Sequence, residues 1–210
     1  MAGAFISLEG IDGCGKTTQA RLLAEWLQEL GRDVVLTRQP GGTPVGVELR
    51  ELVLSPDHDI NPEAELFLYL ADRAIHVADI VVPALARGQV VVCERYTDST
   101  LAYQGYGRGL DLALLQRLNR MATGGLQTDL TVVLDLPVAE ARLDASRLDR
   151  LESAGRSFSE RVAKGFRALA GAEPERIKQV DGRPSIEAVH AQIRTLVSTV
   201  VGEARPRETS

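Results

Sequence analysis

The stretch of sequence that decides the fold occupies residues 10–18 and reads Gly10-Ile11-Asp12-Gly13-Cys14-Gly15-Lys16-Thr17-Thr18. The residues before it, Phe5 to Glu9, form an apolar run of strand length. The residues after it, Thr18 to Leu30, repeat apolar side chains at the spacing of one helix face. A Gly-x-x-x-x-Gly-Lys-Thr sequence between a strand and a helix is typical of a P-loop, in which backbone N–H groups surround a phosphate. The alternative is a glycine-rich turn with an incidental Lys-Thr, which the flanking strand and helix disfavour.

Each part of this stretch has a predicted role in holding nucleotide phosphates, and we expect all of residues 10–18 to line the phosphate site. Lys16 supplies a cation for the β- and γ-phosphates, and the hydroxyl of Thr17 is a ligand for Mg²⁺. Cys14 fits as a compact side chain. Asp12 is unusual, because a carboxylate beside a triphosphate is unfavourable unless an arginine, a hydroxyl or a metal contacts it. The alternative for Asp12 is a solvent-facing acid in a turn.

Four further strand candidates follow, each short and nearly continuously apolar: Val34 to Arg38, Val90 to Glu94, Leu130 to Asp135 and Ile177 to Val180. Helical periodicity fills the intervals at Pro62 to Arg87, Leu110 to Met121, Val138 to about Leu148, Ser159 to Leu169 and Ser185 to Val201. Apolar strands that alternate with helices indicate an α/β fold, a doubly wound parallel five-stranded sheet with helices on both faces. In such folds, ligands bind beyond the carboxyl ends of the strands.

Length and composition narrow the class of protein. The 210 residues suit one domain, predicted at 1–201, followed by a disordered tail at 202–210. The net charge of −5 argues against sequence-independent binding of nucleic acid, and the chain has no apolar run of about 20 residues that would span a membrane. The start of the chain does not read as a signal peptide, and two cysteines, Cys14 and Cys93, provide no disulfide framework. We therefore expect a cytoplasmic protein.

Molecular switches, motors and kinases all use a P-loop, and the rest of the chain separates these classes. A GTPase reads guanine with an Asn/Thr-Lys-x-Asp motif, and neither Lys164 nor Lys178 lies in one. No Asp-x-x-Gly follows the later strands, and a large ATPase motor usually needs a longer chain. A small phosphotransferase with a pocket for a phosphate acceptor fits best.

Further motifs stand at the ends of the second and third predicted strands and on the long helix. They are Arg38-Gln39-Pro40-Gly41-Gly42-Thr43, Glu94-Arg95-Tyr96, Ser99-Thr100-Leu101-Ala102-Tyr103-Gln104-Gly105 and Ala71-Asp72-Arg73-Ala74. With these motifs and the P-loop in order, the chain closely resembles the thymidylate kinase family from Phe5 to about Leu169. The resemblance implies an enzyme that uses ATP and Mg²⁺ to phosphorylate dTMP to dTDP, in dTTP synthesis. It also implies a homodimer.

The resemblance, taken residue by residue, predicts where dTMP binds. Arg38 and Arg95 end two strands at the ligand edge, where guanidinium groups suit the acceptor phosphate, the alternative being a pair of surface salt bridges. Tyr69 and Arg73, four residues apart on one helix face, would stack on the pyrimidine and hydrogen-bond its edge, although Tyr69 also suits core packing. The other predicted contacts of dTMP are Thr100 and Gln104 at the base, Tyr103 against the sugar, and Ser99.

Residues 142–156 resemble the LID of the family, with Asp149-Arg150-x-Glu152 as its core. Some members carry an arginine in the P-loop, which this chain lacks, so the positive charge for the moving phosphoryl group must come from elsewhere. We expect Arg150, aided by Arg142 or Arg147, to close over ATP, the alternative being a solvated charged helix. The predicted catalytic residues are thus Lys16, Arg95, Arg150 and Asp12.

Departures from the family pattern leave alternatives open. Glu94 stands where the family often has Asp, and it either orients Arg95 or reaches Mg²⁺ through water, whereas Gln39 replaces a common Glu. The bond before Pro40 tends to be cis in the family. The acceptor could instead be dUMP, UMP or a guanine nucleotide, and the rival from another class is a nucleotide-binding regulator that has lost catalysis.

Overall fold

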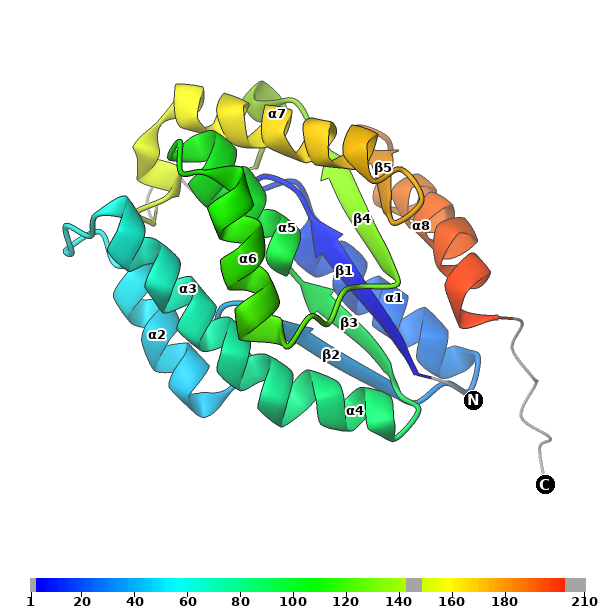
Figure 1. Cartoon of the computed structure of the whole chain (residues 1–210). Helices are drawn as coiled ribbons and strands as arrows, with labels where there is room; N and C mark the ends of the chain where they lie inside the picture. Colours follow the sequence, from blue (N-terminus) through cyan, green and yellow to red (C-terminus); the bar gives the residue numbers. More distant parts are fainter. Residues whose placement is uncertain (1–2, 143–148, 203–210) are drawn as a thin grey trace.

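Five parallel strands form one sheet in the computed structural model of the chain, which describes residues 3–142 and 149–202 (Figure 1). The strands are β1 (Ala4–Glu9), β2 (Val34–Arg38), β3 (Val90–Glu94), β4 (Leu130–Asp135) and β5 (Ile177–Asp181). Their order across the sheet is β2-β3-β1-β4-β5, and each neighbouring pair is parallel. The predicted strands are confirmed, with one residue added at the start of β1 and one at the end of β5.

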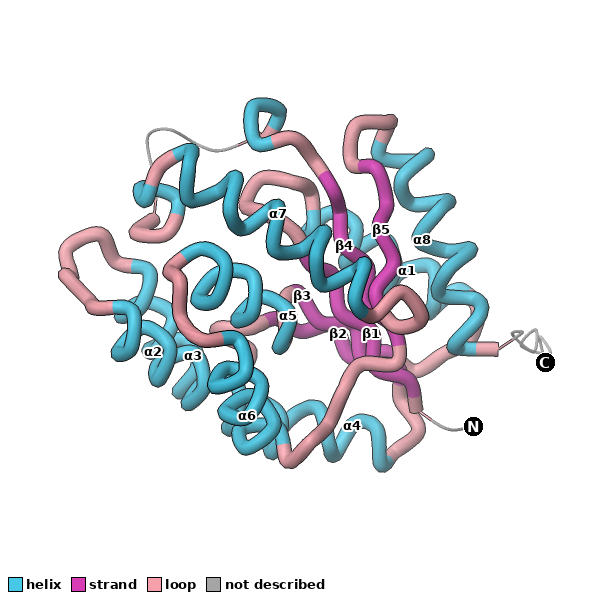
Figure 2. Tube along the Cα trace, turned by 45° about the horizontal axis from the view of Figure 1, so that its top comes forward, coloured by secondary structure: helices cyan, strands magenta, loops and turns pink. Residues whose placement is uncertain are grey.

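Helices cover both faces of the sheet. They are α1 (Lys16–Glu29), α2 (Pro44–Leu54), α3 (Pro62–His76), α4 (Val82–Ala86), α5 (Thr97–Thr100), α6 (Leu112–Thr123), α7 (Arg156–Ala172) and α8 (Ile186–Val201). Two wider π-helical segments, η1 (Val77–Val81) and η2 (Leu101–Gly107), continue α3 and α5. Helices α1 and α8 pack together on one face, and α4 and α7 lie on the other (Figure 2). The predicted doubly wound α/β fold is confirmed.

Strand β1 is buried along its whole length, and its side chains enter two separate apolar clusters. Phe5 belongs to the cluster that contains Val81 of η1, whereas Ile6 and Leu8 belong to the cluster that contains Leu23 of α1. Successive side chains of a strand point to opposite faces, so a central strand with helices on both sides needs apolar residues on both of its faces. This packing holds the carboxyl end of β1, and the loop that follows it, in a defined place.

Local signals explain where several helices begin. The N-cap side chains of α2, α3, α6 and α8 each accept a hydrogen bond from the backbone N–H three residues later, and they are Thr43, Asn61, Asp111 and Ser185. A proline at the first helical position, where no backbone N–H is needed, also favours the start of α2 and of α3.

Some predicted helix bounds are wrong. The helix predicted from Val138 to about Leu148 begins instead as a single 3₁₀ turn, η3 (Val138–Glu140), after which Ala141 is extended. Residues 143–148 of that prediction lie outside the described residues. Val138 and Ala141 still pack against the core, so their apolar spacing serves a short turn rather than a helix. The long helix predicted to reach Arg87 is divided into α3, η1 and α4, and α2 was not predicted.

A second 3₁₀ turn, η4 (Glu152–Ala154), precedes α7. The predicted tail from residue 203 onward and the predicted LID residue Arg147 lie outside the described residues. None of the helices in the described part of the chain combines the length and the apolar character that crossing a bilayer would need.

Candidate active site

The P-loop joins β1 to α1 along a path that requires glycine. Gly13 has a φ angle of 72°, in the left-handed region that favours glycine. A side chain at Gly13 would lie 2.7 Å from the backbone nitrogen of Arg142, which donates a hydrogen bond to the Gly13 carbonyl at 3.2 Å. The predicted strand–loop–helix context of residues 10–18 is therefore present, and the backbone of Arg142 lies directly against it.

A pocket opens beside the P-loop, at the carboxyl ends of β1, β2 and β3. The P-loop side of this phosphate pocket is lined by Asp12, Gly13, Gly15, Lys16, Thr17 and Thr18. The opposite side is lined by Arg38, Gln39, Arg50, Glu94, Arg95 and Arg142. One lysine and four arginines thus face the same space. Such a concentration of positive charge suits a polyphosphate.

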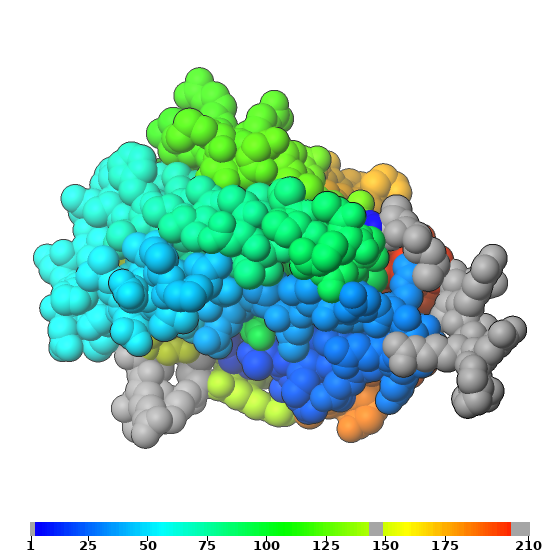
Figure 3. Space-filling model, turned by 90° about the horizontal axis from the view of Figure 1, so that it is seen from below, coloured from blue at the N-terminus to red at the C-terminus, as the bar shows by residue number. Residues whose placement is uncertain are grey.

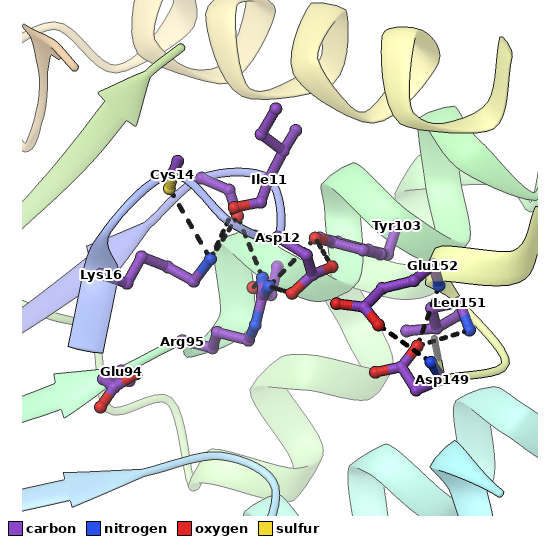
Figure 4. A network of polar contacts seen from close by, with 12 residues as sticks. Ile11, Asp12, Cys14, Lys16, Glu94, Arg95, Tyr103, Asp149, Leu151 and Glu152 are labelled. Atoms are coloured by element: carbon purple, nitrogen blue, oxygen red, sulfur yellow. Dashed lines mark hydrogen bonds and ion pairs between the residues drawn. The ribbon is translucent and has the colours of Figure 1, made fainter. Parts of the chain in front are cut away.

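Lys16 is buried and its ammonium group lies on the inner side of the loop. It donates to the carbonyl of Gly10 at 3.2 Å and to that of Ile11 at 2.7 Å, and it lies 3.7 Å from the sulfur of Cys14 (Figure 4). Gly10, Ile11 and Cys14, which were predicted to hold phosphates, therefore contact the lysine of the motif.

Thr17 and Glu94 meet at the edge of the phosphate pocket. The hydroxyl of Thr17 donates to a carboxylate oxygen of Glu94 at 2.8 Å, from the first turn of α1 to the end of β3. Mg²⁺ in nucleotide sites is usually held by one or two protein oxygens together with substrate phosphates. No group of three or more metal-binding side chains is found among the described residues, so a complete protein cage is absent there. The hydroxyl and carboxylate pair fits a nucleotide-bound Mg²⁺.

Arg95 has an uncommon backbone conformation, with a φ of 66° directly after β3. Its guanidinium group lies over the P-loop, where it donates to the carboxylate of Asp12 and to the carbonyl of Gly10, while Tyr103 donates to Asp12 at 2.8 Å (Figure 4). Burial alone would raise the pKa of Asp12, but the charges of Arg95 and Lys16 outweigh burial and lower that pKa to about 2. Asp12 thus has the arginine and hydroxyl partners that a carboxylate in a phosphate site requires.

A second pocket, here called the acceptor pocket, adjoins the phosphate pocket. The predicted residues that line it are Tyr69, Arg73, Arg95, Ser99, Thr100, Tyr103 and Gln104. Its other walls are formed by Asp12, Gln39, Pro40, Arg50, Leu54, Asp149 and Leu151. Arg38, predicted to hold the acceptor phosphate, is exposed and lines the phosphate pocket instead. Arg50 lines both pockets and was missed because it lies on the unpredicted helix α2.

The side chain of Arg73 is held in a buried network beneath the acceptor pocket. It donates to Gln39 at 2.9 Å and to Thr100 at 2.6 Å, and Gln39 contacts His76 at 2.7 Å. The Gln39–Pro40 peptide bond is cis. Gln39, where the family commonly has Glu, is therefore a neutral link between Arg73 and His76 rather than a metal ligand.

The thymidylate kinase family model matches residues 8–193 of the chain. The chain belongs to the thymidylate kinase family. It is therefore a kinase, and the predicted family and enzyme class are confirmed.

Relatives across bacteria agree with this assignment. The chain is 51% identical to a thymidylate kinase of Nostoc sp. strain PCC 7120, over 94% of this chain and 97% of that one. It is 55% identical to a thymidylate kinase of Synechococcus sp. strain JA-3-3Ab, over 97% of this chain and 99% of that one. The crystal structure of thymidylate kinase from Ehrlichia chaffeensis matches with a TM-score of 0.80 and 34% identity, covering 94% of this chain and 99% of that one.

The two described LID arginines of this kinase, Arg142 and Arg150, lie in different places. Arg142 lines the phosphate pocket, as predicted, and is exposed. Arg150 instead forms an ion pair with Glu65 at 2.6 Å and donates to the backbone carbonyls of Val53 at 3.0 Å and Ile60 at 3.4 Å. These contacts lie at the end of α2 and the start of α3. In this structure Arg150 therefore lies on the acceptor side, where it pairs with a buried carboxylate, and not over the phosphates.

Proposed function

We propose that this kinase transfers the γ-phosphoryl group of ATP to dTMP, forming ADP and dTDP for dTTP synthesis. The observation that carries the proposal is the shared wall of the two pockets. Asp12, Gln39, Arg50 and Arg95 line both the phosphate pocket and the acceptor pocket. A donor held by the P-loop and an acceptor in the neighbouring pocket would meet at Arg95, which is the arrangement that direct transfer between two phosphates needs.

On the donor side, the P-loop backbone and Lys16 bind the β- and γ-phosphates, and Arg142 adds charge at the pocket edge. Thr17 and Glu94 would hold Mg²⁺, the latter directly or through water, and a bound Mg²⁺ would neutralise charge on the donor phosphates. Lys16 exchanges its carbonyl contacts for phosphate oxygens when the donor enters. These residues position and stabilise charge, which is most of what phosphoryl transfer requires of a protein.

On the acceptor side, Arg95 contacts the phosphate of dTMP, and Arg38 and Arg50 add positive charge from the wall of β2 and α2. Asp12 keeps Arg95 in place through a charge-assisted hydrogen bond. No general base is required, because a phosphate oxygen is already anionic. Closure over the pockets excludes water, so that the acceptor phosphate is the nucleophile.

The nucleoside of dTMP lies deeper in the acceptor pocket. The ring of Tyr69 stacks on the pyrimidine, Arg73 and Gln104 contact its polar edge, and Thr100 and Ser99 complete the wall. The hydroxyl of Tyr103 is fixed by Asp12. The ring of Tyr103 would lie against the sugar and crowd a ribose 2′-hydroxyl. This favours a deoxynucleotide.

A coupled assay of ADP release tests the activity. We expect release that depends on dTMP, and faster turnover of dTMP than of dUMP, UMP or GMP. Faster turnover of UMP would overturn the assignment of the base and sugar. ADP release that is indifferent to every monophosphate would favour a regulator without kinase activity.

We also propose that the enzyme is a cytoplasmic homodimer. Both cysteines are free and buried, which suits a reducing compartment. Large apolar side chains are exposed on two helices that contact each other, Phe67 on α3 and Met121 on α6. Figure 3 shows α2 and the α3–α4 segment side by side across one face. Val47 of α2 and Val82 of α4 are also exposed. An apolar face of this kind supports helix-to-helix pairing of two copies.

A further inference from the structure

Glu65 is a fully buried acid that joins three separate segments of the chain. It lies in the first turns of α3, is 0% exposed, and is not part of the P-loop or of any motif that predicted the site. Its carboxylate accepts from Gln104 at 2.7 Å and from Arg108 at 2.9 Å, and it pairs with Arg150 at 2.6 Å. A buried acid with this many partners is a fixed point in the structure, because removing it would leave several donors unpaired.

The contact with Glu65 fixes which end of the Gln104 amide faces the acceptor pocket. An ionised carboxylate only accepts hydrogen bonds, so it takes the Nε2 donor of Gln104. The carbonyl oxygen of Gln104 then remains for the pocket that this side chain lines. A carbonyl accepts from a ring N–H, which thymine and uracil have at N3, and it opposes the unprotonated N3 of cytosine.

The ion pair with Arg150 gives Glu65 a second connection. Arg150 stands between Asp149 and Leu151, both of which line the acceptor pocket. Its backbone N–H donates to the carbonyl of Leu54 at 3.0 Å, so main chain and side chain together hold this segment against α2 and α3. The wall of the acceptor pocket at Asp149 and Leu151 is therefore anchored on Glu65.

We propose that Glu65 is the positioning residue that sets base specificity: it holds the Gln104 carbonyl toward the base and, through Arg150, holds the pocket wall closed around it. This inference rests on the proposed function, since it concerns the base of the acceptor nucleotide. Under this proposal Arg150 fixes the wall of the acceptor pocket and does not contact the transferring phosphoryl group.

The test is Glu65→Gln. In that variant Arg108 and Arg150 occupy the carbonyl of the new amide, whose NH₂ then faces Gln104. Gln104 must turn over and present its own NH₂ to the pocket. We expect the ratio of kcat/KM for dTMP to that for dCMP to fall by about tenfold or more, the effect of one reversed hydrogen bond. Glu63→Gln, on the exposed face of the same helix turn, is the matched control, and its ratio should equal that of the wild type.

A second variant keeps the proposal testable if Glu65→Gln does not fold. The double variant Glu65→Gln with Arg150→Gln keeps the net charge of the cluster, and circular dichroism confirms that it is folded. The proposal predicts the same fall in the dTMP to dCMP ratio, whereas an unchanged ratio in a folded variant overturns it. Failure of the wild type to phosphorylate dTMP would instead overturn the proposed function.

Arg150→Gln alone separates the two roles considered for this arginine. If Arg150 fixes the pocket wall, Arg150→Gln should raise the KM for dTMP about tenfold and change kcat less than threefold. The ratio of kcat/KM for dTMP to that for dCMP should stay the same. A large fall in kcat at unchanged KM would place Arg150 in charge stabilisation and overturn that part of the inference.

Discussion

At the scale of single residues, the site depends on how Arg95 and Asp12 hold each other above the P-loop. Replacing Asp12 by Asn keeps an acceptor for the Tyr103 hydroxyl but removes the charge that fixes Arg95. We expect kcat with dTMP to fall by about tenfold or more, because a charge-assisted hydrogen bond contributes roughly 1.5–3 kcal/mol. Steady-state kinetics of Asp12→Asn measure this fall. Asp33→Asn, an exposed change before β2, should leave kcat as it is, and equal activity of the two variants would contradict the role of Asp12.

His76 gives a second prediction at this scale, through pH. Burial, with a smaller contribution from the charge of Arg73, lowers the pKa of His76 from 6.5 to about 4. The unfolded chain therefore binds a proton near pH 6.5 that the folded protein does not bind until pH 4. The contribution of neutral His76 to the free energy of unfolding is therefore fully present above pH 6.5. This contribution, up to about 3 kcal/mol, is lost as the pH falls toward 4.

Urea unfolding at pH 7.5 and pH 4.5 measures this loss. In His76→Asn the amide oxygen can still accept from Gln39, but the titrating group is gone. We expect the variant to lose less stability than the wild type between the two pH values. Equal losses would mean that other groups cause the acid sensitivity.

At the scale of secondary-structure elements, the sequence predicted best those elements whose residues are determined by local packing. All five strands were recognised because each is short and largely apolar, and the central strand β3 (Val90–Glu94) is buried at four of its five positions. Helix α2 was missed although Thr43 and Pro44 mark its start, because it covers the pocket and buries only Gly46 and Val53. A helix with so little buried surface shows weak periodicity. Arg50 was missed together with that helix.

The contacts of Arg150 were unpredictable for a different reason. The spacing of Asp149-Arg150-x-Glu152 identified the LID core, but Glu65 lies far away in the sequence, on helix α3. Motif likeness therefore located the segment but gave no sign of the ion pair that its arginine forms with Glu65. By contrast, Tyr69 and Arg73 share a helix face by simple spacing, and both line the acceptor pocket.

The cap of α3 allows a prediction about a whole element. Asn61 accepts from the N–H of Ala64 at 2.8 Å, and the helix that it starts carries Tyr69 and Arg73. Asn61→Ala should lower the free energy of unfolding by about 1 kcal/mol and raise the KM for dTMP several-fold, because the first turn of α3 loosens. Ser185→Ala removes the corresponding cap of α8, which covers the other face of the sheet, and should cost similar stability at unchanged KM. A KM that rises equally in both variants would trace the effect to global stability.

At the scale of the whole molecule, chain topology explains why residues far apart in sequence form one site. The order β2-β3-β1 places the ends of three strands side by side, so that the loops after Glu9, Arg38 and Glu94 share one edge of the sheet. This convergence followed from the strand pattern alone, since parallel strands direct their carboxyl ends to the same side. What the pattern did not determine is the depth of each side chain, which placed Arg38 at the phosphate pocket and Arg73 beneath the acceptor pocket.

The proposed homodimer leads to the last prediction, which concerns the oligomeric state of the protein. Phe67 is 61% exposed on α3 and Met121 is 76% exposed on α6, values that are high for large apolar side chains and that a partner copy would reduce. Introducing charge with Phe67→Glu and Met121→Glu should convert the dimer to a monomer, because an acid buried at an apolar interface lacks compensating partners. Light scattering after size-exclusion chromatography measures the mass. Ile186→Glu, at an exposed apolar position of α8, should remain dimeric, and a wild type that elutes as a monomer at micromolar concentration would refute the pairing.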